Sequence, residues 1–136
     1  MTVFVCIDER GGMLFNSRRQ SRDAILIADV CHEVGDGLLY ISDFSEKLFE
    51  ESEASAISVT SPLEAAGEDD FVFVENPPLG PYLHKIKRLI IYNWNKKYPC
   101  DTALDVIPES AGFKKAHSTD FVGKSHDKIT KEVFTK

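Results

Sequence analysis

The sequence predicts an α/β fold, a single domain with a mostly parallel central sheet, antiparallel edge strands and flanking helices. Two observations lead to it. Short apolar runs alternate with helical patterns over the first two thirds of the chain, which is the order of strand–helix–strand units. The runs at 71–74 and 89–92 are apolar without interruption, so both faces of these strands should be covered by other elements.

The expected elements are joined by short connections. Strands are expected at 2–7, 38–41, 56–60, 71–74 and 89–92, and helices from about 21 or 22 to 32, at 43–49, at 61–67 and as one turn at 82–86. Residues 13–20 have no clear periodicity and should be irregular. Further strands are expected at 103–107 and, antiparallel, at 113–121. The segment 125–136 is compatible with a strand or a helix, and the spacing of Ile129 and Val133 mildly favours a helix.

Length and composition limit the class of protein. With 136 residues and 43% hydrophobic side chains, the chain can bury a sizeable core. It has neither an apolar run of the roughly 20 residues that span a bilayer nor a basic N-terminal leader, so we expect no membrane association and a cytoplasmic location. Three scattered cysteines suit a reducing compartment better than a disulfide framework.

The net charge of −6 disfavours a surface for nucleic acid. The charge is unevenly distributed, however, because residues 46–70 hold eight acids and one lysine, a balance of −7. The rest of the chain has fourteen acids and fifteen bases. A local site for an anion therefore remains compatible with the overall acidity.

The densest polar cluster surrounds the start of the first helix. It consists of Asn16, Arg18, Arg19, Gln20, Arg22 and Asp23. Guanidinium groups beside free helix amides could hold a carboxylate or phosphate, which predicts a small-molecule ligand, possibly an anionic one. Asp23 is the candidate catalytic residue, because its carboxyl group could hydrogen-bond the amidine-like edge of a ligand or, if desolvated, donate a proton. The alternative is a solvated loop in which Asp23 only favours the helix dipole.

Other polar residues give weaker indications. Glu75 and Asn76 follow a predicted buried strand at its carboxyl edge, where α/β sheets place ligands, although Asn76 could equally form a turn. The four histidines lack metal-ligand spacing, so no metal site is predicted. Ser125, His126 and Asp127 are neighbours in sequence and should point apart, as in a turn or cap rather than a catalytic triad.

The order of elements resembles dihydrofolate reductase over nearly the whole chain. Asp23 takes that family's acidic active-site position when the family's first loop and helix are aligned with the segment from Gly11-Gly12-Met13 to Arg22-Asp23-Ala24. The family's second strand and the helix start after it are matched here by Leu39-Tyr40-Ile41 and Ser42-Asp43-Phe44-Ser45. Its later strands are matched by Phe71-Val72-Phe73-Val74 and by Lys87 to Tyr92, the latter with Asp101-Thr102. The resemblance implies that Tyr82 lies beneath a nicotinamide cofactor.

Three features that serve cofactor and substrate in that family are absent. Glu75-Asn76-Pro77-Pro78 stands where the family has the Gly-Gly pair that approaches the pyrophosphate, and Ser42-Asp43-Phe44-Ser45 replaces its Gly-Arg-x-Thr stretch. Arg18 occupies the place of the loop tryptophan. Because added carboxylates repel phosphate, NADPH is a possible but disfavoured cofactor.

Longer stretches of the sequence resemble those of small bacterial proteins labelled ribonuclease Z. They include Phe15-Asn16-Ser17-Arg18-Arg19-Gln20-Ser21-Arg22-Asp23 and Ser125-His126-Asp127-Lys128-Ile129-Thr130-Lys131-Glu132. That label implies a metallo-β-lactamase-like nuclease, whose His-x-His-x-Asp-His motif this sequence lacks. The function that we expect first is therefore binding of a small molecule or nucleotide. The alternatives are a residual NADPH-dependent reductase and a non-enzymatic protein-interaction module, with ribonuclease activity ranked last.

Overall fold

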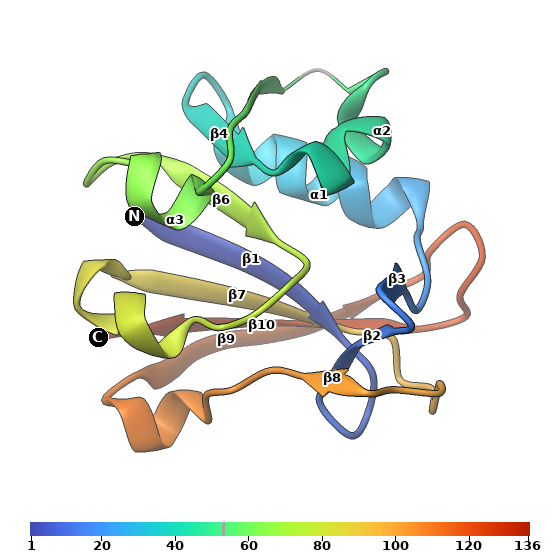
Figure 1. The fold of residues 1–136 in the computed structure, drawn as a ribbon. Helices are drawn as coiled ribbons and strands as arrows, with labels where there is room; N and C mark the ends of the chain where they lie inside the picture. Colours follow the sequence, from blue (N-terminus) through green and yellow to red (C-terminus); the bar gives the residue numbers. More distant parts are fainter. Residues whose placement is uncertain (53) are drawn as a thin grey trace.

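The computed structural model describes residues 1–52 and 54–136, and its centre is a seven-stranded sheet (Figure 1). Glu53, one of the acids of the segment 46–70, lies outside the described residues. The strand order is β5-β4-β6-β1-β7-β10-β9. The strands are β1 (Thr2–Ile7), β4 (Leu38–Ile41), β5 (Ser55–Ser58), β6 (Phe71–Val74), β7 (Arg88–Asn93), β9 (Lys114–Phe121) and β10 (Ile129–Thr135).

The parallel part of the sheet runs from β5 to β7. Strand β1 lies between β6 and β7, with Phe4 opposite Phe73 on one side and Ile90 on the other. All three of these side chains are buried. The uninterrupted apolar runs are therefore explained by covering on both faces, as the sequence predicted.

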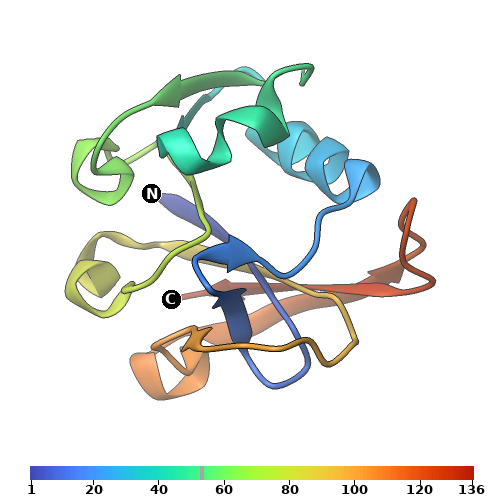
Figure 2. The ribbon, with the colours of Figure 1, turned by 45° about the vertical axis from the view of Figure 1, so that its right-hand side comes forward.

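Each face of the sheet has its own hydrophobic core. Helix α1 (Ala24–Val34) packs Leu26 and Val30 on one face, together with Phe49 of the short helix α2 (Glu46–Phe49). The opposite face is covered by α3 (Pro62–Ala65), the 3-10 turns η2 (Gly80–Lys85) and η3 (Pro108–Ala111), and loops (Figure 2). Helix α1 ends at Gly35, whose φ of 55° suits a residue without a Cβ atom.

The last two strands complete the sheet in antiparallel orientation. Strand β10 pairs with β7 on one side and with β9 on the other. The weak helical periodicity of 125–136 was therefore misleading, because Ile129 and Val133 are also four apart on one face of a strand. The prediction of an antiparallel strand at 113–121 is confirmed.

Residues 13–20 are more regular than we expected. Strands β2 (Gly12–Phe15) and β3 (Arg18–Arg19) form a hairpin, and β8 (Thr102–Ala103) pairs with β2 to complete a second, three-stranded sheet. The turn residues Asn16 and Ser17 have φ angles of 51° and 60°, the backbone of a two-residue hairpin turn that twists with its strands. Beyond Ala103, the strand expected to reach residue 107 does not continue.

Candidate functional site

Arg19 and Glu75 join the first helix region to the end of strand β6. The Nε atom of Arg19 lies 2.7 Å from Oε1 of Glu75, and a second guanidinium nitrogen lies 3.0 Å from Oε2. Ser45 also donates to Glu75, and Arg19 covers the ring of Phe44 at 4.7 Å from its centroid. The pair brings together the two regions that the sequence singled out, but it also neutralises Arg19 as an anion-binding group.

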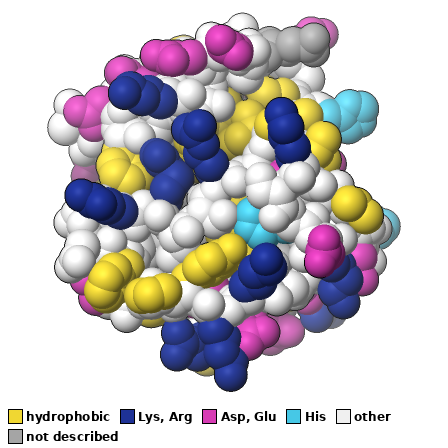
Figure 3. Space-filling model, turned by 90° about the vertical axis from the view of Figure 1, so that its right-hand side faces the viewer, with side chains coloured by type: hydrophobic (Ala, Val, Ile, Leu, Met, Phe, Trp, Pro, Cys, Tyr) yellow, Lys and Arg dark blue, Asp and Glu magenta, His cyan; other side chains and the backbone are white. Residues whose placement is uncertain are grey.

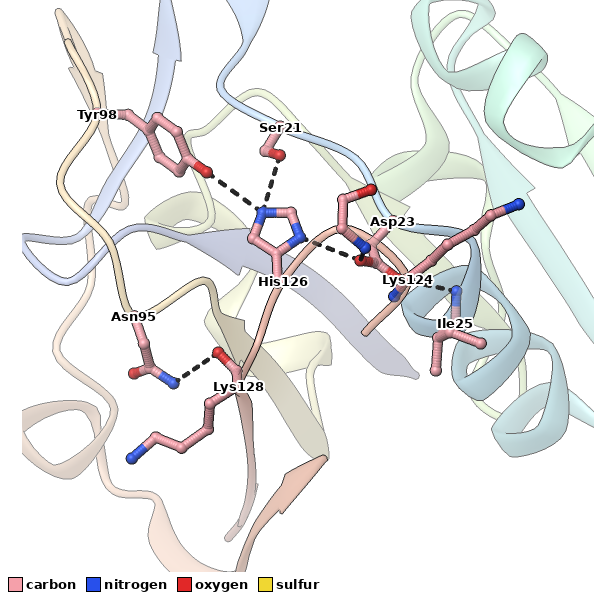
Figure 4. A network of polar contacts seen from close by, with 9 residues as sticks. Ser21, Asp23, Ile25, Asn95, Tyr98, Lys124, His126 and Lys128 are labelled. Carbon is pink, nitrogen blue, oxygen red and sulfur yellow. Dashed lines mark hydrogen bonds and ion pairs between the residues drawn. The ribbon is translucent and has the colours of Figure 1, made fainter. Parts of the chain in front are cut away.

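Asp23 is buried at the start of α1 and accepts four hydrogen bonds (Figure 4). The amide of Ile25 donates to Oδ1 at 2.9 Å, which makes Asp23 the N-cap of the helix. From the loop between β9 and β10, the amides of Lys124 and Ser125 donate to Oδ1 and Oδ2 at 2.9 and 2.8 Å. The fourth partner is Nδ1 of His126, at 3.0 Å from Oδ2.

These contacts decide the charge of Asp23. Burial raises the pKa of this carboxyl group, but the hydrogen bonds from Lys124, Ser125, His126 and Ile25 outweigh burial and lower the pKa to about 2. An ionised Asp23 has no proton to donate at neutral pH, because the hydrogen bonds stabilise its charged form. Its role in capping the helix agrees with the alternative interpretation.

His126 is the residue that sequence reasoning missed. The residue is 5% exposed, and its ring stacks on Trp94 with 4.5 Å between ring centroids. The Nε2 atom lies 3.0 Å from Oγ of Ser21 and 3.2 Å from the hydroxyl oxygen of Tyr98. The neighbours Ser125 and Asp127 do not provide these side-chain contacts, and the partners of His126 come from positions up to 105 residues away.

Gly123 allows the loop between β9 and β10 to approach Asp23. A Cβ atom at this position would lie 2.5 Å from Oδ2 of Asp23 and 2.9 Å from Cδ1 of Ile129. Because neither neighbour can give way without losing buried contacts, the close approach requires glycine. This packing places the amides of Lys124 and Ser125 within reach of Asp23.

Four of the predicted site residues lie together in one cleft. Asn16, Glu75, Asn76 and Tyr82 line a cleft of about 770 Å³ at the carboxyl ends of β4 and β6. The cleft also contains Asp43 and Asp101, so that three carboxylates line it, while its lining in the described part of the chain includes no lysine or arginine.

The second cavity is small and lies beside the buried network. Arg19, Arg22 and Asp23 line this space of about 20 Å³, together with Ser21 and Trp94. Arg22 also lines a groove of about 1110 Å³ along α1. Figure 3 shows this side of the molecule, where hydrophobic side chains lie between lysine and arginine side chains.

Arg18 and Cys6 do not strengthen the predicted site. Arg18 is exposed on β3 and lies in the lining of neither cavity. Cys6 borders the small cavity, but burial, followed by the Glu75 carboxylate, raises the pKa of its thiol well above the ordinary value, so it is a poor nucleophile. Within residues 1–52 and 54–136, no three His, Cys, Asp or Glu side chains are grouped to hold a metal ion.

Comparison with known proteins identifies the fold. No protein-family model and no curated protein matches the sequence. Among solved structures, a dihydrofolate reductase from Enterococcus faecalis, complexed with NADP(H) and RAB-propyl, is similar with a TM-score of 0.69 over 98% of this chain and 94% of that one. The chain has the dihydrofolate reductase fold.

The fold expected from the resemblance is thereby confirmed. The identity is 9%, a level at which the similarity describes the backbone arrangement alone. Ligand and chemistry must be argued from this chain's own side chains. None of the described helices has the length and apolar character needed to cross a membrane.

Proposed function

We propose that this protein binds a small organic molecule in the cleft lined by Asn16, Glu75, Asn76 and Tyr82. The observation that carries the proposal is the position of the cleft, a concave space of about 770 Å³ at the carboxyl ends of β4 and β6. This is the edge at which open α/β sheets bind ligands, and its volume is in the range of small-molecule sites.

The charges of the cleft select the chemistry of the ligand. The arginines of the sequence suggested an anion, but Arg19 is paired with Glu75 and the cleft lining holds Asp43 and Asp101. Carboxylates attract cations and hydrogen-bond donors and repel phosphate. We therefore propose a neutral or cationic heterocycle with amino groups, such as a nucleoside or a pterin, in preference to a nucleotide.

A titration of matched ligands tests this proposal. Adenosine, adenosine monophosphate and a neutral pterin are titrated against the protein while backbone amide NMR shifts are recorded. We expect shifts at Asn76 and Asp101 with adenosine or the pterin, and binding about tenfold weaker or more for the monophosphate. Tighter binding of the monophosphate, or no shift with any of the three, would contradict the proposal.

Two variants control for nonspecific binding. Asn76→Arg fills the cleft and should weaken binding of the nucleoside at least tenfold. Ser110→Arg adds the same charge at an exposed position of η3 and should leave binding unchanged. Equal effects of the two variants would show that the ligand binds elsewhere.

NADPH is the second candidate ligand, because the similar reductase structure is a complex with NADP(H). In this chain Glu75-Asn76-Pro77-Pro78 lies at the end of β6, next to the acidic cleft. A fluorescence titration distinguishes the candidates. We expect no change in NADPH fluorescence up to millimolar concentration, whereas saturable binding would make a reductase the better proposal.

A further inference from the structure

Ser21, His126 and Asp23 form a continuous series of hydrogen bonds outside the cleft. The distance from Oγ of Ser21 to Nε2 of His126 is 3.0 Å, and the distance from Nδ1 of His126 to Oδ2 of Asp23 is also 3.0 Å (Figure 4). A nucleophile, a base and a residue that orients the base are linked in this way in hydrolases of unrelated fold.

Asp23 fixes the direction of its hydrogen bond with His126. Asp23 is ionised and held by three backbone amides, so the Nδ1 atom of His126 carries a proton and donates it to Oδ2. With the ring proton on Nδ1, the Nε2 atom can accept from either of two hydroxyl groups, that of Ser21 at 3.0 Å and that of Tyr98 at 3.2 Å. Stacking on Trp94 holds the imidazole ring in this orientation.

The surroundings of Ser21 differ from those of the other two residues. Asp23 and His126 are buried, whereas Ser21 is partly exposed and lines the cavity of about 20 Å³. A substrate can therefore reach the hydroxyl group, while the base and its orienting carboxylate are shielded from water. Arg22 lines the same cavity and supplies a cation for a developing oxyanion, since Arg19 is occupied by Glu75.

We propose that Ser21 is the nucleophile of an esterase site for small acyl groups, with His126 as general base and Asp23 as a positioning residue. In the first step Oγ of Ser21 bonds to the acyl carbon, Nε2 of His126 takes the hydroxyl proton, and this proton passes to the leaving alcohol as the ester bond breaks. In the second step water attacks the acyl-serine, gives a proton through His126 to Oγ, and releases the carboxylic acid.

The size of the cavity limits the acyl group. A volume of about 20 Å³ holds roughly one water-sized group, which corresponds to the methyl group of an acetyl ester. Leu26 and Trp94 provide apolar walls. The preferred substrates are therefore acetyl esters with good leaving groups, and longer acyl chains do not fit.

Acetylation by p-nitrophenyl acetate tests this proposal directly. With protein in micromolar amounts, we expect a burst of p-nitrophenol and, after acid quenching, one acetyl group that peptide mapping places on Ser21. The burst should be absent in Ser21→Ala and kept in Ser118→Ala, a matched change on the exposed strand β9. Acetylation of a lysine or of Tyr98 in place of Ser21, or a burst that persists in Ser21→Ala, would overturn the proposal.

Further measurements separate catalysis from folding. His126→Gln should slow acetylation at least 100-fold, and Ser21→Cys should restore a burst that Ser21→Ala lacks. In the wild-type protein the rate should fall in acid, because protonated imidazole cannot accept the hydroxyl proton. If His126→Gln fails to fold, the serine variants and the pH profile still test the proposal. An acetylation rate that changes neither in the serine variants nor with pH would overturn it.

A comparison of esters tests the assigned acyl group. We expect p-nitrophenyl butyrate to acylate Ser21 at least tenfold more slowly than p-nitrophenyl acetate does, because the butyryl chain exceeds the cavity. Equal rates would show that the acyl group does not enter this space. The assay does not involve the cleft lined by Asn76 and Asp101, so its outcome is independent of the ligand proposed there.

Discussion

The two polar regions of this molecule are built in opposite ways. Around His126, the polar atoms of Asp23 are buried and bonded to other parts of the chain. In the cleft, Asp43 and Asp101 are exposed to solvent. Arg19 and Glu75 connect the two regions. The difference indicates that the first region fixes a geometry, whereas the second leaves hydrogen-bonding groups available to a ligand.

Replacement of Asp23 should give the largest difference between the regions. Asp23→Ala leaves three amides and His126 without their acceptor, so we expect a loss of about 3 kcal/mol in the free energy of unfolding. Asp101→Ala, in the cleft, should cost about 1 kcal/mol or less. Urea denaturation at neutral pH measures both, and equal losses would contradict this comparison.

Strong acid should weaken the buried region. The pKa of Asp23 is about 2 in the folded protein, below the ordinary value of 3.8, so its contribution to stability is complete above pH 5 or so and is lost as the pH falls through about 2. This contribution is about 2 kcal/mol. In Asp23→Asn, the acid-dependent part of the unfolding free energy should shrink by that amount. Parallel pH curves for the variant and the wild type would refute the assignment.

The connection between the regions should be measurable as a coupling. The Arg19 and Glu75 side chains are 24% and 9% exposed and form two parallel hydrogen bonds, so a double-mutant cycle with alanine should give about 1–2 kcal/mol. In the matched pair Lys87 and Glu68 both side chains are exposed, so this pair should show no measurable coupling. A larger coupling for this control pair would reverse the interpretation.

The smallest effect is expected at Tyr98. Tyr98→Phe removes one of two hydroxyl groups near Nε2 of His126, and Ser21 remains as a partner. We expect a loss of about 0.5–1 kcal/mol in chemical denaturation. A loss as large as that of Asp23→Ala would mean that Tyr98, rather than Ser21, is the principal partner of His126.

Much of the secondary structure could be predicted because its signals are local. The bounds of β1, β4 and β6 match the expected strands at 2–7, 38–41 and 71–74, where apolar runs end at polar or glycine residues. The hairpin of β2 and β3 was missed because Asn16 and Ser17 adopt positive φ angles without a glycine to indicate the turn. The last strand was ambiguous because a spacing of four suits both strand and helix.

The site was predicted only in part. The sequence placed Asp23 at a helix start and Glu75 at a strand end, and both were correctly located. It did not indicate that Glu75 pairs with Arg19, since 56 residues separate them. His126 was assigned to a turn because neighbouring side chains in the sequence point away from one another. Its hydrogen-bond partners are distant in the sequence, so only the folded structure shows them.

The sequence by itself determined the α/β order, the buried strands and the acidic character of residues 46–70. These properties depend on composition and on contacts close along the chain. Only the tertiary structure decided which polar groups meet, and with them the charge of Asp23, the neutralisation of Arg19 and the contact between Ser21 and His126. The physical reason is that hydrogen bonds and pKa values depend on distances between side chains, which the folded sheet and its loops set.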